Sequence, residues 1–146
     1  MSELYDFVAE SNRIEGITRA PAAIELTAHE QFLETPKLTI VGLKNFVAAI
    51  QPSARLRDKA GLDVRVGQYF PPAGCIGIRV ALQKLLDEIN AGNHSAYSAH
   101  LAYEHLHPFT DGNGRSGRAI WLWQMKGRAP LGFLHHWYYS SLSSER

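Results

Sequence analysis

The chain has 146 residues, of which 45% are hydrophobic and 20% are charged, and this composition is typical of one ordinary globular domain. The formal net charge is only +1, too weak a field to favour nucleic acid or an anionic membrane surface as a partner. No stretch approaches the roughly 20 apolar residues that a membrane-spanning helix needs.

The first predicted element is a helix over residues 3–15 that ends at Gly16. Its apolar residues recur at helical spacing and form one stripe. At about 100° per residue, Ser11 and Glu15 lie in the middle of that stripe, so a hydroxyl and a carboxylate share the face that should be buried. A buried carboxylate needs a cationic partner. The alternative is that Glu15 is hydrated at a frayed helix end.

Further along the chain, helical patterns alternate with turn residues. A capping box formed by Thr27 and Glu30 predicts the start of a short helix that Pro36 ends. The remaining predicted helices cover residues 40–50, 82–89, 95–106, 115–126 and 138–146. Residues 62–70 alternate in hydrophobicity for part of their length, which predicts a short strand or hairpin. The sequence therefore predicts a mainly α fold, a compact helical bundle with one small β element.

Cysteine content and the first residues favour the cytoplasm. Cys75 is the single cysteine, so no disulfide can form within the chain, and a reducing compartment suits that count. The first residues include the acids Glu3, Asp6 and Glu10 and no long apolar run, unlike a secretory signal peptide. We therefore expect a cytoplasmic protein.

The most informative segment is residues 107–118, His-Pro-Phe-Thr-Asp-Gly-Asn-Gly-Arg-Ser-Gly-Arg. A Gly-rich loop between two helices turns backbone N–H groups toward the N-terminus of the outgoing helix, where anions bind. Arg115 and Arg118 are three residues apart, so they should share a helix face and bind a polyphosphate. Asp111 is an oxygen ligand suited to Mg²⁺ beside phosphates, and His107 is a candidate general base. Together these residues predict a site that binds a nucleotide and a metal ion and contains a general base. They do not identify the phosphorus atom that is attacked.

The same segment resembles the motif of the Fic family, H-P-F-x-[D/E]-G-N-G-R-x-x-R, at every fixed position. Ala99-His100 resembles part of the family's helix before the motif. Val64-Arg65-Val66-Gly67, which precedes Pro71-Pro72, resembles the family's flap hairpin, which docks the target. The resemblance implies one Fic domain over residues 1–146, with the flap beside the active-site loop.

By this resemblance the protein is an adenylyltransferase that moves AMP from Mg-ATP to a Ser, Thr or Tyr hydroxyl of a target protein. His107 would deprotonate the hydroxyl, and Asp111 would hold Mg²⁺ across the α- and β-phosphates. Three residues would form the anion hole: Gly112, Asn113 and Gly114. Two would bind the β- and γ-phosphates: Arg115 and Arg118. Because proteins of this family often self-associate, the resemblance also implies a possible homo-oligomer.

Ser11 to Gly16 resembles the inhibitory motif of the same family, [S/T]-x-x-x-E-[G/N]. In that scheme Glu15 pairs with Arg118 and keeps this arginine from the γ-phosphate. The resemblance therefore implies an autoinhibited enzyme with an N-terminal inhibitory helix at about residues 3–16.

Other interpretations of the loop remain open at this point. The same site could transfer a phosphate or another nucleotide-linked group, or remove AMP from a target. The chain could also be a non-catalytic module that binds partners along its flap, although His107 and Asp111 would then have no purpose. The simplest alternative is a joint between two helices in which the glycines only make the turn.

Overall fold

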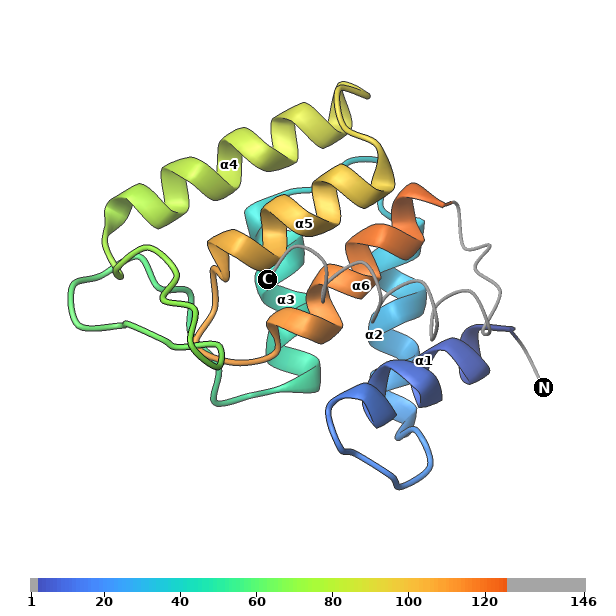
Figure 1. The fold of residues 1–146 in the computed structure, drawn as a ribbon. Helices are drawn as coiled ribbons and strands as arrows, with labels where there is room; N and C mark the ends of the chain where they lie inside the picture. Colours follow the sequence, from blue (N-terminus) through green and yellow to red (C-terminus); the bar gives the residue numbers. More distant parts are fainter. Residues whose placement is uncertain (1–2, 126–146) are drawn as a thin grey trace.

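A computed structural model describes residues 3–125, and the helix predicted at 138–146 lies outside this range. The described chain forms six helices: α1 (Glu3–Ile14), α2 (Ala23–Glu34), α3 (Ile40–Ile50), α4 (Ile76–Asn90), α5 (Ala96–Leu106) and α6 (Asn113–Gln124) (Figure 1). The mainly α bundle is therefore confirmed. Within residues 3–125, none of the helices has both the length and the apolar character needed to cross a membrane.

Helix α6 lies at the centre of the bundle and contacts α1, α2, α3 and α5, while α4 covers the outer side of α5 (Figure 1). The main hydrophobic core is built from buried residues of α2 to α6. A smaller cluster of Phe7, Trp121 and Leu122 holds α1 against α6, with the rings of Phe7 and Trp121 stacked. The segment that carries the motif arginines is therefore also the structural centre of the fold.

Close packing of α5 on α6 depends on two motif residues. The buried hydroxyls of Tyr103 and Ser116 lie 2.6 Å apart, and burial raises the pKa of the tyrosine. At Gly117 a Cβ atom would lie only 2.9 Å from Glu104 Oε1, so a larger residue would push the helices apart. The variable positions of the motif thus determine how the two helices pack.

The start of α2 differs from the prediction. Thr27 does not begin the helix but lies exposed within it, because α2 starts at Ala23. The Glu25 carboxylate reaches back and accepts a hydrogen bond of 2.8 Å from the Ala22 N–H, which satisfies a donor at the helix start. The sequence prediction assigned this role to the wrong glutamate, Glu30.

The predicted β-hairpin at residues 62–70 is not present among the described residues. In its place is a single antiparallel pair, in which Val66 and Tyr69 exchange two backbone hydrogen bonds of 2.9 Å around a turn at Gly67, where φ is +60°. The pairing cannot extend beyond Phe70 because Pro71 and Pro72 follow, and proline has no N–H to donate. We refer to residues 62–72 as the flap segment.

Candidate active site

His107 ends α5 in a left-handed conformation, with φ 50° and ψ 62°. A non-glycine residue pays about 1–2 kcal/mol for this conformation, so its surroundings must hold it there. The imidazole is half-buried, and Nδ1 lies 3.3 Å from the backbone oxygen of Glu104. A carbonyl oxygen only accepts, so Nδ1 carries the proton and Nε2 is the basic nitrogen.

The loop after His107 is fixed by pairing with an earlier segment. Leu56 and Phe109 form an antiparallel bridge, and the Thr110 N–H donates to the Arg55 carbonyl at 2.8 Å. Inside the loop, Asn113 donates from Nδ2 to the Phe109 carbonyl (2.7 Å) and accepts from the Phe109 N–H at Oδ1 (2.9 Å). The Asn113 side chain is thus occupied in shaping the loop, and an anion can meet only its backbone N–H.

The N-terminus of α6 has the features of an anion site. Gly112 is the N-cap residue at φ 77°, a left-handed conformation that suits glycine, and as a glycine it has no side chain with which to cap the helix. The first-turn N–H groups of a helix have no acceptors within the helix, and they lie at its positive end. Asn113 and Gly114 therefore present their N–H groups where phosphate oxygens bind well.

Asp111 is exposed at this end of α6, and its Oδ1 accepts a hydrogen bond of 2.8 Å from the Gly112 N–H. Within residues 3–125 no three His, Cys, Asp or Glu side chains come together as a metal site. One carboxylate beside a phosphate site fits Mg²⁺, which commonly binds to one or two carboxylates, substrate phosphates and water. The residues present therefore fit a metal that arrives with a nucleotide.

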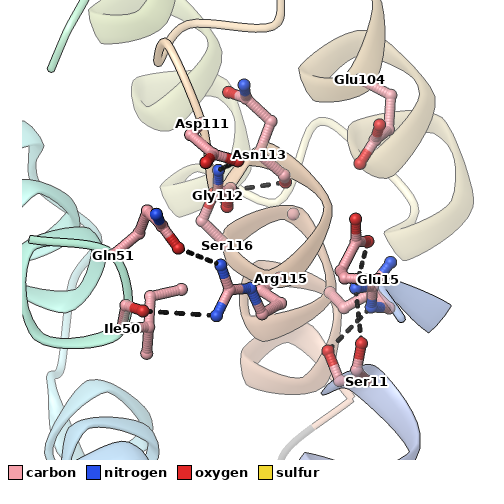
Figure 2. Close-up of polar contacts among 12 residues, drawn as sticks. Ser11, Glu15, Ile50, Gln51, Glu104, Asp111, Gly112, Asn113, Arg115 and Ser116 are labelled. Atoms are coloured by element: carbon pink, nitrogen blue, oxygen red, sulfur yellow. Dashed lines mark hydrogen bonds and ion pairs between the residues drawn. The ribbon is translucent and has the colours of Figure 1, made fainter. Parts of the chain in front are cut away.

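Arg118 is completely buried and contacts both of the polar residues predicted on the inner face of α1. Its Nε donates to Ser11 Oγ (2.8 Å), and one Nη donates to the Ser11 carbonyl (2.9 Å) and to Glu15 Oε2 (2.7 Å). The Glu15 side chain is 38% exposed. Figure 2 shows Ser11 and Glu15 together on one side of α6.

The backbone after α1 explains why Glu15 reaches this position. Gly16 has φ +80°, the Gly16 N–H donates to the Arg13 carbonyl, and the Ile17 N–H donates to the Asn12 carbonyl. These two bonds form a Schellman motif, which ends a helix at a left-handed glycine. Because α1 ends at Ile14 and the chain turns at Gly16, the carboxylate of Glu15 lies at the tip of the helix, beside Gly114 at the start of α6.

Helix α1 is also attached to α2 through Glu25, a contact that sequence reasoning missed. Arg19 forms a two-pronged ion pair with the Glu25 carboxylate at 2.8 and 3.1 Å, and Asn12 Nδ2 donates to it at 3.3 Å. The hydrogen bonds from Arg19 lower the pKa of Glu25 to about 2 despite its burial. Sequence spacing gave no signal, because these residues lie on a turn and on two different helices.

Arg115 does not share a direction with Arg118, which corrects the expectation that both guanidinium groups lie together. Arg115 Nη1 donates to the Ile50 carbonyl (3.3 Å) and Nη2 to Gln51 Oε1 (2.7 Å), both at the end of α3 (Figure 2). Burial lowers the pKa of Arg115, and its acceptors are neutral. Arg115 is therefore bound at the end of α3, whereas Arg118 is bound by α1 and the residue after it, although only three residues separate the two arginines.

The model of the Fic/DOC family matches residues 44–125. The chain belongs to the Fic/DOC family. A search of curated proteins returned no match. The matched span contains the motif loop and its flanking helices, whereas α1 and α2 precede it, so family membership gives no function to α1.

One Fic-domain residue beside the motif loop, Arg57, was missed by sequence reasoning. Its guanidinium is fully buried and donates to four carbonyls: those of His107 (2.7 Å), Leu106 (2.9 Å), Pro72 (2.8 Å) and Leu62 (3.1 Å). Burial lowers the pKa of Arg57. In the sequence it looks like one of several charged surface residues, since its neighbours Arg55, Asp58 and Lys59 are also charged.

The flap segment of the Fic domain lies against the end of α5. Tyr69 donates its hydroxyl to the His105 carbonyl at 2.8 Å. Of the four residues predicted to dock a target, Val64 and Val66 are half-buried, whereas Arg65 and Gly67 are exposed. The Arg65 guanidinium lies over the ring of Phe70, 5.2 Å from its centroid, and Phe70 is 68% exposed.

Proposed function

We propose that this protein transfers AMP from Mg-ATP to a Ser, Thr or Tyr hydroxyl of a target protein, and that Glu15 inhibits the reaction. The observation that carries the proposal is the motif loop of this Fic/DOC chain. The loop runs from the base His107, past the exposed carboxylate of Asp111, to the N-terminus of α6, where the N-cap residue is a glycine. A base, a metal ligand and a phosphate site are thereby contained in one short loop.

The chain's groups suit an in-line displacement at the α-phosphorus. His107 Nε2 takes the proton of the target hydroxyl, whose oxygen bonds to the α-phosphorus while the bond to the β-phosphate oxygen breaks. Pyrophosphate leaves and AMP remains on the target. The α6 N–H groups, with Arg118 when it is released from Glu15, stabilise the phosphate charge. Mg²⁺, held by Asp111, would neutralise part of that charge when bound.

Inhibition follows from competition for one guanidinium group. Arg118 is buried and donates to Ser11 and to the Glu15 carboxylate, so a nucleotide phosphate must replace the carboxylate to accept the hydrogen bond that Glu15 now accepts. The Glu15 carboxylate and a nucleotide phosphate are both anionic, so the phosphate can accept the same charge-assisted hydrogen bonds from Arg118. Glu15 is partly exposed, so it can be hydrated once it is displaced. Among residues 3–125 no carboxylate forms an ion pair with Arg115, and its role as a phosphate ligand remains a prediction.

The test uses ATP labelled at either the α- or the γ-phosphate. Purified Glu15→Gly protein is incubated with each label and a cell lysate, and label on protein is measured. We expect label above that of a lysate-only control from the α-position only, since kinases of the lysate add γ-label with or without this protein. We expect His107→Ala in this background to lose about 10²–10⁴-fold in rate while keeping most of its nucleotide affinity. Transfer from the γ-position would replace this proposal with a kinase, and label from neither position would refute it.

Asp111→Ala in the same background tests the metal assignment. We expect Mg²⁺-dependent ATP affinity and transfer to be lost together, because the carboxylate is the chain's proposed ligand in the loop. Titration calorimetry with and without Mg²⁺ measures the affinity. An unchanged Mg-ATP affinity would show that Asp111 does not hold the metal.

A further inference from the structure

Arg57 connects three parts of the site through one planar group. Its Nε and one Nη bind the carbonyls of His107 and Leu106 at the end of α5. The other Nη binds the carbonyls of Leu62 and Pro72, the two ends of the flap segment. The base and both ends of the flap segment are therefore attached to the same guanidinium.

The backbone of Arg57 strengthens this connection. Its N–H donates to the Pro108 carbonyl at 2.8 Å, and its own carbonyl accepts from the Cys75 N–H at 3.1 Å. One residue thus contacts the chain immediately after His107 and the chain immediately after the flap segment. A shift of Arg57 would move both.

The acceptors around Arg57 explain why an arginine is needed. The last carbonyls of a helix have no partner within the helix and lie at its negative end, where a cation is stabilised. No carboxylate lies within ion-pair distance of Arg57 among the described residues. Arginine offers five N–H donors in a rigid plane, whereas lysine offers a point charge that cannot reach four separated carbonyls.

We propose that Arg57 is a positioning residue that holds the His107 imidazole at a fixed place relative to the flap segment. A target segment bound along the flap then presents its hydroxyl to His107 Nε2. This proposal rests on the proposed function. The main competing explanation is that Arg57 only stabilises the fold. Its contact with the carbonyl of His107, whose left-handed backbone must be held, favours the positioning role.

The test compares Arg57→Lys with a matched control, Arg55→Lys, both in the Glu15→Gly background. Arg55 lies two residues earlier on the same segment and is exposed. We expect Arg57→Lys to lower kcat for target modification about 10- to 100-fold, since a displacement of about 1 Å costs this much. We expect Mg-ATP affinity to stay unchanged, because Arg57 contacts none of the proposed phosphate groups. Arg55→Lys should match its parent.

Two readouts do not require activity. Hydrogen exchange at the Val66 and Tyr69 amides should accelerate in Arg57→Lys, and the NMR signals of the His107 ring should shift. Neither should change in Arg55→Lys. A variant with parental kcat, exchange and ring signals would overturn the proposal. So would a fall in kcat matched by equal losses of Mg-ATP affinity and thermal stability, which would make Arg57 purely structural.

Two further outcomes can be distinguished from a failure of the positioning role. If the Glu15→Gly parent transfers no AMP, the proposed function fails, while hydrogen exchange and the His107 signals still test the positioning role. If Arg57→Lys does not fold, Tyr69→Phe replaces it, because this variant removes another bond between the flap segment and α5. We then expect faster flap exchange and a kcat lowered several-fold. Unchanged values in Tyr69→Phe would overturn the proposal.

Discussion

Arg115 and Arg118 leave the same helix three residues apart, yet they are held in different ways. Arg115 is bound at the end of α3 by the Ile50 carbonyl and the Gln51 amide oxygen, and both of these acceptors are neutral. Arg118 is bound by Ser11 and by the carboxylate of Glu15, which is 38% exposed. The first arrangement resembles a permanent part of the core, whereas the second includes an anion that another anion can replace.

This difference indicates which of the two contacts is suited to regulation. A contact can be exchanged for a ligand when the ligand supplies the same chemistry and the displaced group can return to water. Glu15 meets both conditions with respect to a phosphate, whereas the neutral amide of Gln51 fails the first. The region around α1 is therefore the adjustable side of α6, and the region around α3 is its fixed side.

The largest expected effect is at Glu15. If the contact with Arg118 favours the inhibited arrangement by roughly 3 kcal/mol, Glu15→Gly should raise α-labelled AMP transfer on the order of 100-fold. Glu15→Gly combined with Arg118→Ala should return to low transfer, because the released arginine is gone. Equal labelling by wild type and Glu15→Gly, with a good target present, would show that α1 is only structural.

Acid should lower the folding stability of the protein through His29, whose ring packs against both sides of the bundle. This ring lies between Phe7 of α1 and Phe46 of α3, and burial lowers its pKa from 6.5 to about 4. Above pH 6.5 the ring is neutral in both states and contributes no pH dependence. From pH 6.5 down to 4 the unfolded chain binds a proton that the folded chain does not, so stability should fall by about 1.4 kcal/mol per pH unit.

Denaturant unfolding at several pH values checks this slope. His29→Leu should flatten it, whatever the absolute stability of that variant. A slope that stays the same in His29→Leu would assign the titration to another group.

Arg115→Met should destabilise the protein by about 1–3 kcal/mol, because it leaves the buried Ile50 carbonyl without its side-chain donor. Denaturant unfolding should give this loss whether residue 15 is Glu or Gly, since Arg115 is held on the fixed side. A loss that disappears in the Glu15→Gly background would mean that the two sides are coupled.

The smallest expected effect is that of Gly114→Ala on stability, and its sign should depend on the residue at position 15. A Cβ atom at Gly114 would collide with Glu15 Oε2, so Gly114→Ala should displace Glu15 and destabilise the wild type. In the Glu15→Gly background the carboxylate is gone, and the neighbour that stays, Arg118 Nη1 at 3.1 Å from the Cβ, has lost its Glu15 partner and can shift, so alanine should stabilise α6 by up to about 1 kcal/mol. A double-mutant cycle from thermal unfolding measures this. The same sign in both backgrounds would contradict the position of Glu15.

The inner face of α1 was predictable because a helix repeats every 3.6 residues, so the spacing alone places Ser11 and Glu15 on one side. The motif loop was predictable because its residue types each have a restricted use. The actual pairing of residues 62–70 was not, because alternation predicts a strand while the later Pro71 and Pro72 decide how far pairing can run.

The partners of Arg57 and Arg115 were beyond sequence reasoning for a physical reason. The Arg57 guanidinium binds only backbone carbonyls, which every residue carries, and Arg115 binds one such carbonyl and the neutral side chain of Gln51, so no complementary charge marks the partner. The His107 carbonyl lies 50 residues from Arg57 along the chain, and the Ile50 carbonyl 65 residues from Arg115. A carboxylate partner such as Glu15 can be recognised in the sequence, because it is a charged residue within an apolar stripe, whereas a backbone carbonyl cannot be recognised in this way.

The order of α1 and α6 along the chain also matters during synthesis. Glu15 precedes Arg118 by 103 residues, and a ribosome makes chains from the N-terminus at about 5–20 residues per second. Glu15 and the helix before it have therefore been made several seconds before Arg118. Under the proposed function, each newly made Arg118 folds against a carboxylate that is already waiting, so a nascent chain has no interval of uncontrolled activity.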